Sequence, residues 1–237
     1  MITNSFIFLP GIKTKTEQNI WNQNIKDWND FLQTKEVKGI SSKRKIFFNG
    51  LIKSAKEAYL NEDLEWFIKN WPSSETWRLY DYFKDECCYI DIEGDINIIG
   101  IYDGYETRTM IRKINMDISL LRKELSKYKL VITYNGGAYD LPKLKKYFNL
   151  FHDKIHIDLK TICRRVNLTG GLKNIEKMLK IKRAPHLYGS AASCYRAFLA
   201  SGRREFLEGL VEYNEQDCIS LKPIMKYCYL KLVNIRD

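Results

Sequence analysis

The sequence predicts an α/β protein in which a mixed β-sheet is flanked by helices and preceded by a helical N-terminal region. Up to about residue 85, apolar residues recur at helical spacing. Beyond it, apolar segments with the two-residue alternation of strands come first and helices follow them. The 237 residues suffice for one sizeable core and a smaller region. We therefore expect a helical accessory region over 1–85 and a second domain over 86–237.

In the N-terminal region, the first helix is expected to begin at Thr14, which together with Glu17 fits a capping box, and to run through Trp21. Ser42 is expected to cap a longer helix that reaches about Leu60. Shorter helices are expected over about 25–32, 61–71 and 73–83.

The second region is expected to begin with three strands. The first is CCYIDIE (87–93), and the next two, 96–104 and 105–114, form a hairpin with Asp103-Gly104 at its turn. Further strands are expected over 129–136 and 156–158, and helices over about 117–128, 138–148, 158–166, 172–180, 190–201, 204–214 and 216–233. The predicted order is three antiparallel strands, a helix, a further strand and then helices. This is the element order of an RNase H-like domain. A fold alone does not determine function, so the function must come from particular residues.

Composition excludes several classes of protein. A hydrophobic content of 45% indicates a globular chain, and no apolar run approaches the roughly 18 residues that span a bilayer. The N-terminal residues lack the features of a signal peptide, so we expect a cytoplasmic protein without a membrane partner. The six cysteines form no Cys-x-x-Cys pair and the three histidines add no zinc spacing. We expect buried, reduced thiols.

The chain is basic, with a formal net charge of +10. Residues 1–85 hold 13 basic and 11 acidic residues, so a charge of +8 lies in the remainder. A polyanionic partner such as nucleic acid is the natural inference. The alternative is a lysine-rich surface that only keeps the protein soluble.

The first strand of the second region carries two carboxylates that its apolar pattern does not require. Side chains alternate along a strand, so Asp91 and Glu93 share one face with Tyr89, and Ile90 and Ile92 lie on the other. Neighbouring carboxylates repel each other and resist desolvation. This face must therefore be wet, or its charge must be compensated.

Two further stretches place acids in unexpected positions. In YNGGAYDLP (134–142), Asp140 follows a glycine-containing turn and stands at the start of a predicted helix. Considered by itself, a carboxylate at this position would only stabilise the N-terminal end of the helix. In LVEYNEQDCISL (210–221), Tyr213 and Asp217 share a helix face. Four carboxylates converging at one end of the sheet would suit hard cations, Mg²⁺ or Mn²⁺, as a pair of ions about 3.5–4 Å apart.

These stretches resemble the three motifs of the DEDD, or DnaQ-like, 3′–5′ exonucleases: DIE (91–93), NGGAYD (135–140) and YNEQD (213–217). The Tyr four residues before the last Asp indicates the DEDDy branch. Details such as HIDL and VITYNGGAYDLP are similar to the RNase H-like predicted exonuclease group of bacteria and archaea. The resemblance covers about residues 86–222. One departure is Gly94, where the family usually has Thr after the first-motif Glu.

The resemblance implies a role for each motif residue. Asp91 would bridge both metal ions, Glu93 and Asp217 would complete the first metal site, and Asp140 would hold the second through water. Tyr213 would orient the attacking water. Two more residues are expected to contact nucleic acid: Asn135 at the terminal nucleotide and Lys143 after the second motif. Other basic residues that could line a groove for the backbone are Lys145, Lys146, Arg164, Arg165, Lys173, Lys182, Arg183, Arg203 and Arg204.

The predicted function is a two-metal 3′–5′ exonuclease acting on single-stranded DNA. The sequence leaves open an exoribonuclease, a catalytically silent nucleic-acid-binding protein and a structure-specific endonuclease. The aromatic-rich N-terminal helices are also compatible with a homo-oligomer.

Overall fold

The structure is a computed structural model that describes residues 2–183 and 191–234. The chain divides into two compact units, Met1–Tyr82 (unit 1) and Phe83–Asp237 (unit 2). Among the described helices, none combines the length and the apolar character that crossing a membrane requires.

Unit 1 is helical, as predicted. Three of its helices begin directly after a short polar residue: Asp27, Ser41 or Asp63. The side chain of this residue accepts hydrogen bonds from free backbone N–H groups in the first turn of the helix. Ser41, not Ser42, therefore caps the longest helix of unit 1. The α-helices are α1 (Thr14–Trp21), α2 (Trp28–Gln33), α3 (Ser42–Leu60), α4 (Leu64–Asn70) and α5 (Tyr80–Phe83), with 3₁₀ turns at Ile2–Asn4 and Ser73–Leu79. A further 3₁₀ turn, Lys84–Glu86, belongs to unit 2.

The predicted capping box at Thr14 is wrong. Lys13 takes the N-cap position of α1 and makes no side-chain cap. Glu17, the expected partner, is fully buried and accepts hydrogen bonds from Ser5 Oγ (2.9 Å) and the Phe6 backbone N–H (2.7 Å). A buried carboxylate needs such compensation more than an exposed helix end needs a cap.

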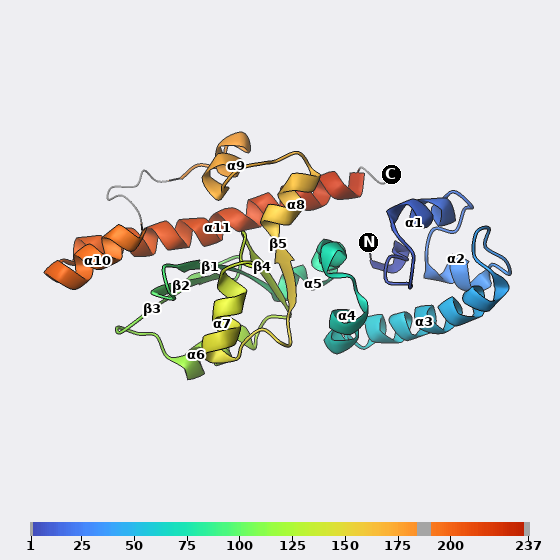
Figure 1. Cartoon of the computed structure of the whole chain (residues 1–237), viewed down its shortest axis with the longest axis horizontal. Coiled ribbons are helices and arrows are strands. Elements are labelled where there is room, and N and C mark those ends of the chain that lie inside the picture. The colour runs from blue at the N-terminus through green and yellow to red at the C-terminus, as the bar shows by residue number, and fades with distance from the viewer. Residues whose placement is uncertain (1, 184–190, 235–237) are drawn as a thin grey trace. The chain divides into compact units, whose positions relative to one another are not determined.

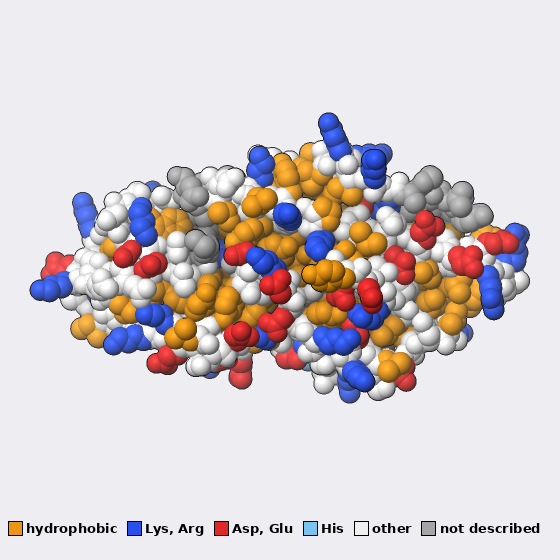
Figure 2. Space-filling view, turned by 180° about the vertical axis from the view of Figure 1, so that it is seen from behind, with side chains coloured by type: hydrophobic (Ala, Val, Ile, Leu, Met, Phe, Trp, Pro, Cys, Tyr) orange, Lys and Arg blue, Asp and Glu red, His pale blue; other side chains and the backbone are white. Residues whose placement is uncertain are grey.

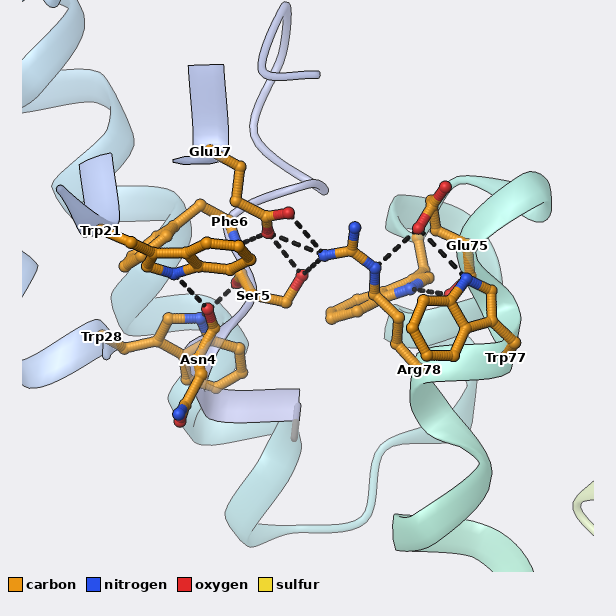
Figure 3. Close-up of polar contacts among 10 residues, drawn as sticks. Asn4, Ser5, Phe6, Glu17, Trp21, Trp28, Glu75, Trp77 and Arg78 are labelled. Atoms are coloured by element: carbon orange, nitrogen blue, oxygen red, sulfur yellow. Dashed lines mark hydrogen bonds and ion pairs between the residues drawn. The ribbon is translucent and has the colours of Figure 1, made fainter. Parts of the chain in front are cut away.

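The main compensating charge for Glu17 is Arg78, which comes from the 3₁₀ turn Ser73–Leu79 (Figure 3). Arg78 Nη1 lies 2.7 Å from Glu17 Oε1 and 2.5 Å from Ser5 Oγ, while its Nε donates to Glu75 Oε2 at 2.6 Å. All three charged side chains are buried. A buried ionic cluster therefore ties the N-terminal turn of unit 1 to its last turns.

Unit 2 contains a five-stranded mixed sheet, as predicted. Its order is β3-β2-β1-β4-β5, with β1, β2 and β3 antiparallel and β4 and β5 parallel to β1. The strands are β1 (Cys87–Glu93), β2 (Ile98–Tyr102), β3 (Thr107–Ile111), β4 (Leu130–Thr133) and β5 (Ile155–Asp158). The carboxyl ends of β1, β4 and β5 thus lie along one edge of the sheet.

The two helices predicted at 204–214 and 216–233 are one continuous helix. No residue near position 215 breaks the pattern, and even Pro223 is accommodated, because Leu221, Ile224 and Met225 keep that stretch buried. The helices of unit 2 are α6 (Ile118–Leu125), α7 (Asp140–Phe148), α8 (Leu159–Arg165), α9 (Leu172–Met178), α10 (Ala191–Ser201) and α11 (Arg204–Asn234). Residue 190, the predicted start of the helix over 190–201, lies outside the described residues.

The sheet separates two sets of helices. Ile90 and Ile92 of β1 pack in one apolar core with Leu121 of α6 and Leu144 of α7. The long helix α11 crosses the other face, against β1 and β2 (Figure 1). The predicted alternation along β1 is confirmed, and Asp91 lies on the α11 side.

All six cysteines are buried free thiols, as predicted. On the side shown in Figure 2, Lys and Arg side chains are interspersed with acidic and apolar ones. On this face the positive charge therefore does not mark a binding surface by itself, and the acidic residues are the better guide to the site.

Candidate metal centre

Asp91 lies in the middle of β1, where its neighbour across the ladder is Gly100 of β2. Without a side chain at Gly100, helix α11 comes close to the sheet and its buried Asn214 reaches Asp91. Asn214 Nδ2 donates to Asp91 Oδ2 at 2.8 Å and to the Asp91 backbone oxygen at 3.2 Å. Asn214 thus fixes the orientation of the Asp91 carboxylate.

We expect Gly100→Ala to lower the free energy of unfolding by about 1–3 kcal/mol, the usual cost of overpacking. An added Cβ would overlap the Asn214 side-chain oxygen and lie 2.8 Å from Cys218 Sγ, so α11 would have to move. Thermal unfolding checks this. Gly50→Ala in helix α3 is the control, because open space surrounds Gly50 and Ala favours helices. Equal unfolding temperatures for the two variants would contradict the close packing.

Three of the predicted carboxylates form one cluster. One ligand oxygen from each of Asp91, Glu93 and Asp217 lies within 4.8 Å of the other two. Burial and the neighbouring carboxylates raise the pKa of Asp91 well above its usual range and that of Glu93 to about 7. Burial raises the pKa of Asp217 to about 6, although a nearby guanidinium opposes it. A bound divalent cation would favour the ionised form of all three acids.

The raised pKa values predict two opposite effects of pH. As pH rises, the protein without metal should become less stable, while the stabilisation that metal provides should increase. Without metal, Glu93 binds its proton more tightly in the folded state, so the unfolding temperature should fall as pH rises from about 4.5 to about 7. Metal binding requires deprotonated acids, so stabilisation by Mn²⁺ should grow over the same interval. Thermal unfolding at both pH values tests this, with Glu93→Gln as a variant whose pH dependence is reduced. An unfolding temperature without metal that rises with pH would contradict the prediction.

Asp140 is the first residue of α7 and lies outside this three-residue cluster. Its negative charge nonetheless raises the pKa of both Asp91 and Glu93, and burial raises its own pKa to about 6. Asp140, the predicted fourth acid, therefore lies close enough to influence the cluster electrostatically. It is not one of the three acids whose ligand oxygens lie within 4.8 Å of one another.

The loop before α7 is held by Asp158, at the end of β5. Its carboxylate accepts hydrogen bonds from the backbone N–H groups of Asn135 (2.8 Å) and Gly137 (3.1 Å), and caps α8 through the Lys160 N–H (3.0 Å). Asp158 is thus a structural cap. The Asn135 side chain accepts a hydrogen bond from Lys160 Nζ at 3.0 Å. Contact between Asn135 and a terminal nucleotide stays a prediction.

Lys143 of α7 is engaged within the protein. Its Nζ donates to the Gly94 backbone oxygen at 3.0 Å and lies 3.6 Å from Asp95 Oδ1. Gly94 itself has a φ of +65°, which favours glycine and explains the departure from the Thr usual in the resembling family. A role for Lys143 in nucleic-acid binding stays a prediction.

Tyr213 and Asp217 lie one turn apart on α11, as the sequence predicts. Lys173 Nζ lies 4.6 Å, and the Arg183 guanidinium 4.7 Å, from the centre of the Tyr213 ring. Arg183 also forms an ion pair with Asp217. Burial and the acids Asp217 and Glu93 raise the pKa of the Tyr213 phenol, which is therefore protonated at neutral pH.

A comparison with protein families agrees with this geometry. Residues 88–229, which carry all four acids and Tyr213, match the sequence profile of the RNase_H superfamily. The chain belongs to the RNase_H superfamily. Members of this superfamily are generally nucleases that hydrolyse their substrates with divalent metal ions. The predicted RNase H-like sheet is thereby confirmed, and the acidic cluster falls in the matched segment.

Relatives add little about activity. The chain is 27% identical over 208 residues to a Bacillus subtilis (strain 168) protein described as "Uncharacterized protein YprB". The match covers 74% of this chain and spans about half the length of YprB. No solved structure matches the chain significantly.

Two features of the site were not predicted from the sequence: Asn214, and the ion pair of Arg183, a residue expected only to line a groove for the backbone. A signal for Asn214 existed. Gly100 interrupts an apolar strand, which often marks close approach of another element, and Asn214 follows Tyr213 in the third motif.

Proposed function

We propose that the chain is a divalent-metal-dependent 3′–5′ exonuclease that acts on single-stranded DNA by a two-metal mechanism. The observation that carries this proposal is the cluster of half-buried Asp91 and Glu93 with buried Asp217, together with Tyr213 on the same helix as Asp217. Membership of the RNase_H superfamily supports hydrolysis of a phosphodiester bond. The order and spacing of the three motifs support the DEDDy type of exonuclease.

The donor set fits Mg²⁺ or Mn²⁺. The cluster offers carboxylate oxygens alone, without a histidine or cysteine ligand, which suits hard cations. Asp91, Glu93 and Asp217 would hold one ion, and Asp91 together with Asp140 a second. When bound, the ions would supply an activated water and stabilise the leaving oxygen of the phosphodiester.

The remaining residues would orient the reactants. Tyr213 is a neutral phenol at physiological pH, so it can donate or accept a hydrogen bond but does not act as the base. Lys173 lies beside the Tyr213 ring and would contact a backbone phosphate. Asn135, in the loop between β4 and α7, would meet the terminal nucleotide.

A gel assay tests the proposal directly. Single strands of DNA and RNA, each labelled at the 5′ or the 3′ end, are incubated with Mg²⁺, Mn²⁺ or EDTA. A metal-dependent ladder on 5′-labelled DNA that shortens from the 3′ end, with RNA spared, is the expected result. The same ladder on RNA alone would make the protein an exoribonuclease. Binding without cleavage under either metal would refute an enzymatic function.

We expect Tyr213→Phe to slow cleavage by about 10–100-fold, less than the loss of a carboxylate, because it removes one orienting hydrogen bond. Single-turnover rates with 5′-labelled DNA measure this. Tyr195→Phe is the control, since Tyr195 lies on α10 and its hydroxyl donates to the Arg112 backbone oxygen. A Tyr213→Phe rate as low as that of a carboxylate variant would contradict the orienting role.

A further inference from the structure

A chain of charged side chains, with buried Glu176 and Asp217 at its ends and the partly buried Arg183 between them, leads from α9 into the metal centre. Glu176 of α9 is 3% exposed and accepts two hydrogen bonds from Arg183 Nη1, at 3.0 and 3.1 Å. Arg183 Nη2 forms the ion pair with Asp217 and also donates to the Tyr213 backbone oxygen at 3.2 Å. One guanidinium therefore joins a carboxylate outside the cluster to a carboxylate inside it.

The position of Arg183 matters because Asp217 belongs to two ionic arrangements. It is one of the three acids whose ligand oxygens lie within 4.8 Å of one another, and it is the partner of Arg183. A guanidinium and a divalent ion on one carboxylate would lie within a few ångströms of each other in a weakly screened site. They therefore oppose each other at Asp217.

Glu176 provides a second place for the guanidinium. Arg183 can lose Asp217 and keep both hydrogen bonds to Glu176, its bond to the Tyr213 backbone oxygen and its position over the Tyr213 ring. Its charge would then remain compensated in the protein interior. No buried cation would be left alone, which is the usual obstacle to breaking such a pair.

We propose that Arg183 is the resident counter-cation of the metal centre, which occupies Asp217 when metal is absent and is retained by Glu176 when metal takes Asp217. The inference rests on the metal site of the proposed function. Arg183 is thus a positioning residue that sets the affinity for metal, and Glu176 acts through it. The two side chains should shift metal affinity in opposite directions.

The test is Mn²⁺ binding by calorimetry at pH 7.5 on the full chain, with Arg183→Gln and Glu176→Gln as the two variants. Arg183→Gln should bind Mn²⁺ about 5–100-fold more tightly, the usual range for coupling between competing ligands. Glu176→Gln should bind it more weakly, because Arg183 then pairs with Asp217 alone. Thermal unfolding gives a second measurement: Arg183→Gln should melt lower without metal and gain more from Mn²⁺ than the wild type.

The control is Arg203→Gln. Arg203 also pairs with a glutamate, Glu205, and lies over an aromatic ring, that of Phe206, but it is exposed and has no contact with the acidic cluster. Its Mn²⁺ affinity should equal that of the wild type. Asp91→Asn identifies the site, because it should abolish the binding that the other variants modulate.

The outcomes separate the two proposals. Unchanged or weaker Mn²⁺ binding by Arg183→Gln, or tighter binding by Glu176→Gln, would overturn the role of Arg183 and leave the nuclease proposal standing if the wild type still cleaves DNA. Absence of Asp91-dependent Mn²⁺ binding in the wild type would overturn both.

Discussion

Asp91→Asn is expected to reduce metal-dependent cleavage by at least about a thousandfold, the effect of losing several kcal/mol of metal-assisted stabilisation in the transition state. Asp91 is one of the three acids of the cluster, and its carboxylate is the one oriented by Asn214. The substitution keeps an oxygen that can accept the Asn214 hydrogen bond, but it removes the charge that a cation would bind.

The same variant should be at least as stable as the wild type without metal. Burial and the charges of Asp217, Glu93 and Asp140 raise the pKa of Asp91 well above its usual range. The folded state thus disfavours the ionised form, so a neutral side chain removes an energetic cost at neutral pH. Below about pH 4 the carboxyl is protonated in both states and the difference should disappear.

Initial cleavage rates and thermal unfolding without metal, on the same preparations, check both parts. Asp95→Asn is the matched control, because Asp95 follows two residues after Glu93 but is exposed and lies outside the cluster. Its cleavage rate should remain within a few-fold of wild type. An Asp91→Asn enzyme that cleaves DNA at nearly the wild-type rate would show that the site has been assigned wrongly.

Most of the fold could be predicted from patterns between residues close together in the sequence. The two-residue alternation in β1 correctly separated Ile90 and Ile92 from Asp91. In the structure the two isoleucines pack in the core with α6 and α7, and Asp91 faces α11. The i, i+4 spacing of Tyr213 and Asp217 depends only on helix geometry, so it could be predicted without knowing where α11 packs. The element order then indicated which ends of the strands would meet.

Long-range polar contacts could not be predicted. The Arg183–Asp217 pair joins residues 34 positions apart, and Asn214 reaches Asp91 across 123 positions. Helical and strand periods say which face a residue occupies but not which distant side chain it meets. The misassigned capping box has the same origin, because Glu17 fits a local motif and is instead bound by Arg78, 61 residues away.

Because Arg78 compensates the buried Glu17, substituting Arg78 is expected to have the largest effect on the stability of unit 1. Arg78→Met should lower the free energy of unfolding by about 3–5 kcal/mol, the usual result of removing one partner from a buried ion pair. Glu17 would be left fully buried with only Ser5 and the Phe6 N–H as donors, and Glu75 would lose its short bond to Arg78 Nε. Methionine fills similar space, so the loss is mainly electrostatic.

The positions of the tryptophans make the measurement selective for unit 1. All five tryptophans lie in residues 21–77, so urea unfolding followed by tryptophan fluorescence reports on this unit. Arg44→Met is the control, since exposed Arg44 donates to the Pro10 backbone oxygen and lies over the Phe48 ring, and it should cost less than about 1 kcal/mol. An Arg78→Met transition that coincides with that of Arg44→Met would mean that the ionic cluster does not stabilise the unit.

A second substitution separates the charge from the packing. In Arg78→Met with Glu17→Gln, the carboxylate that lost its partner becomes a neutral amide, so part of the lost stability should return. If the loss came instead from poor packing of the introduced methionine side chain, the second substitution would restore nothing. Recovery of the fluorescence midpoint in the double variant therefore assigns the role of Arg78 to charge compensation between the two ends of unit 1.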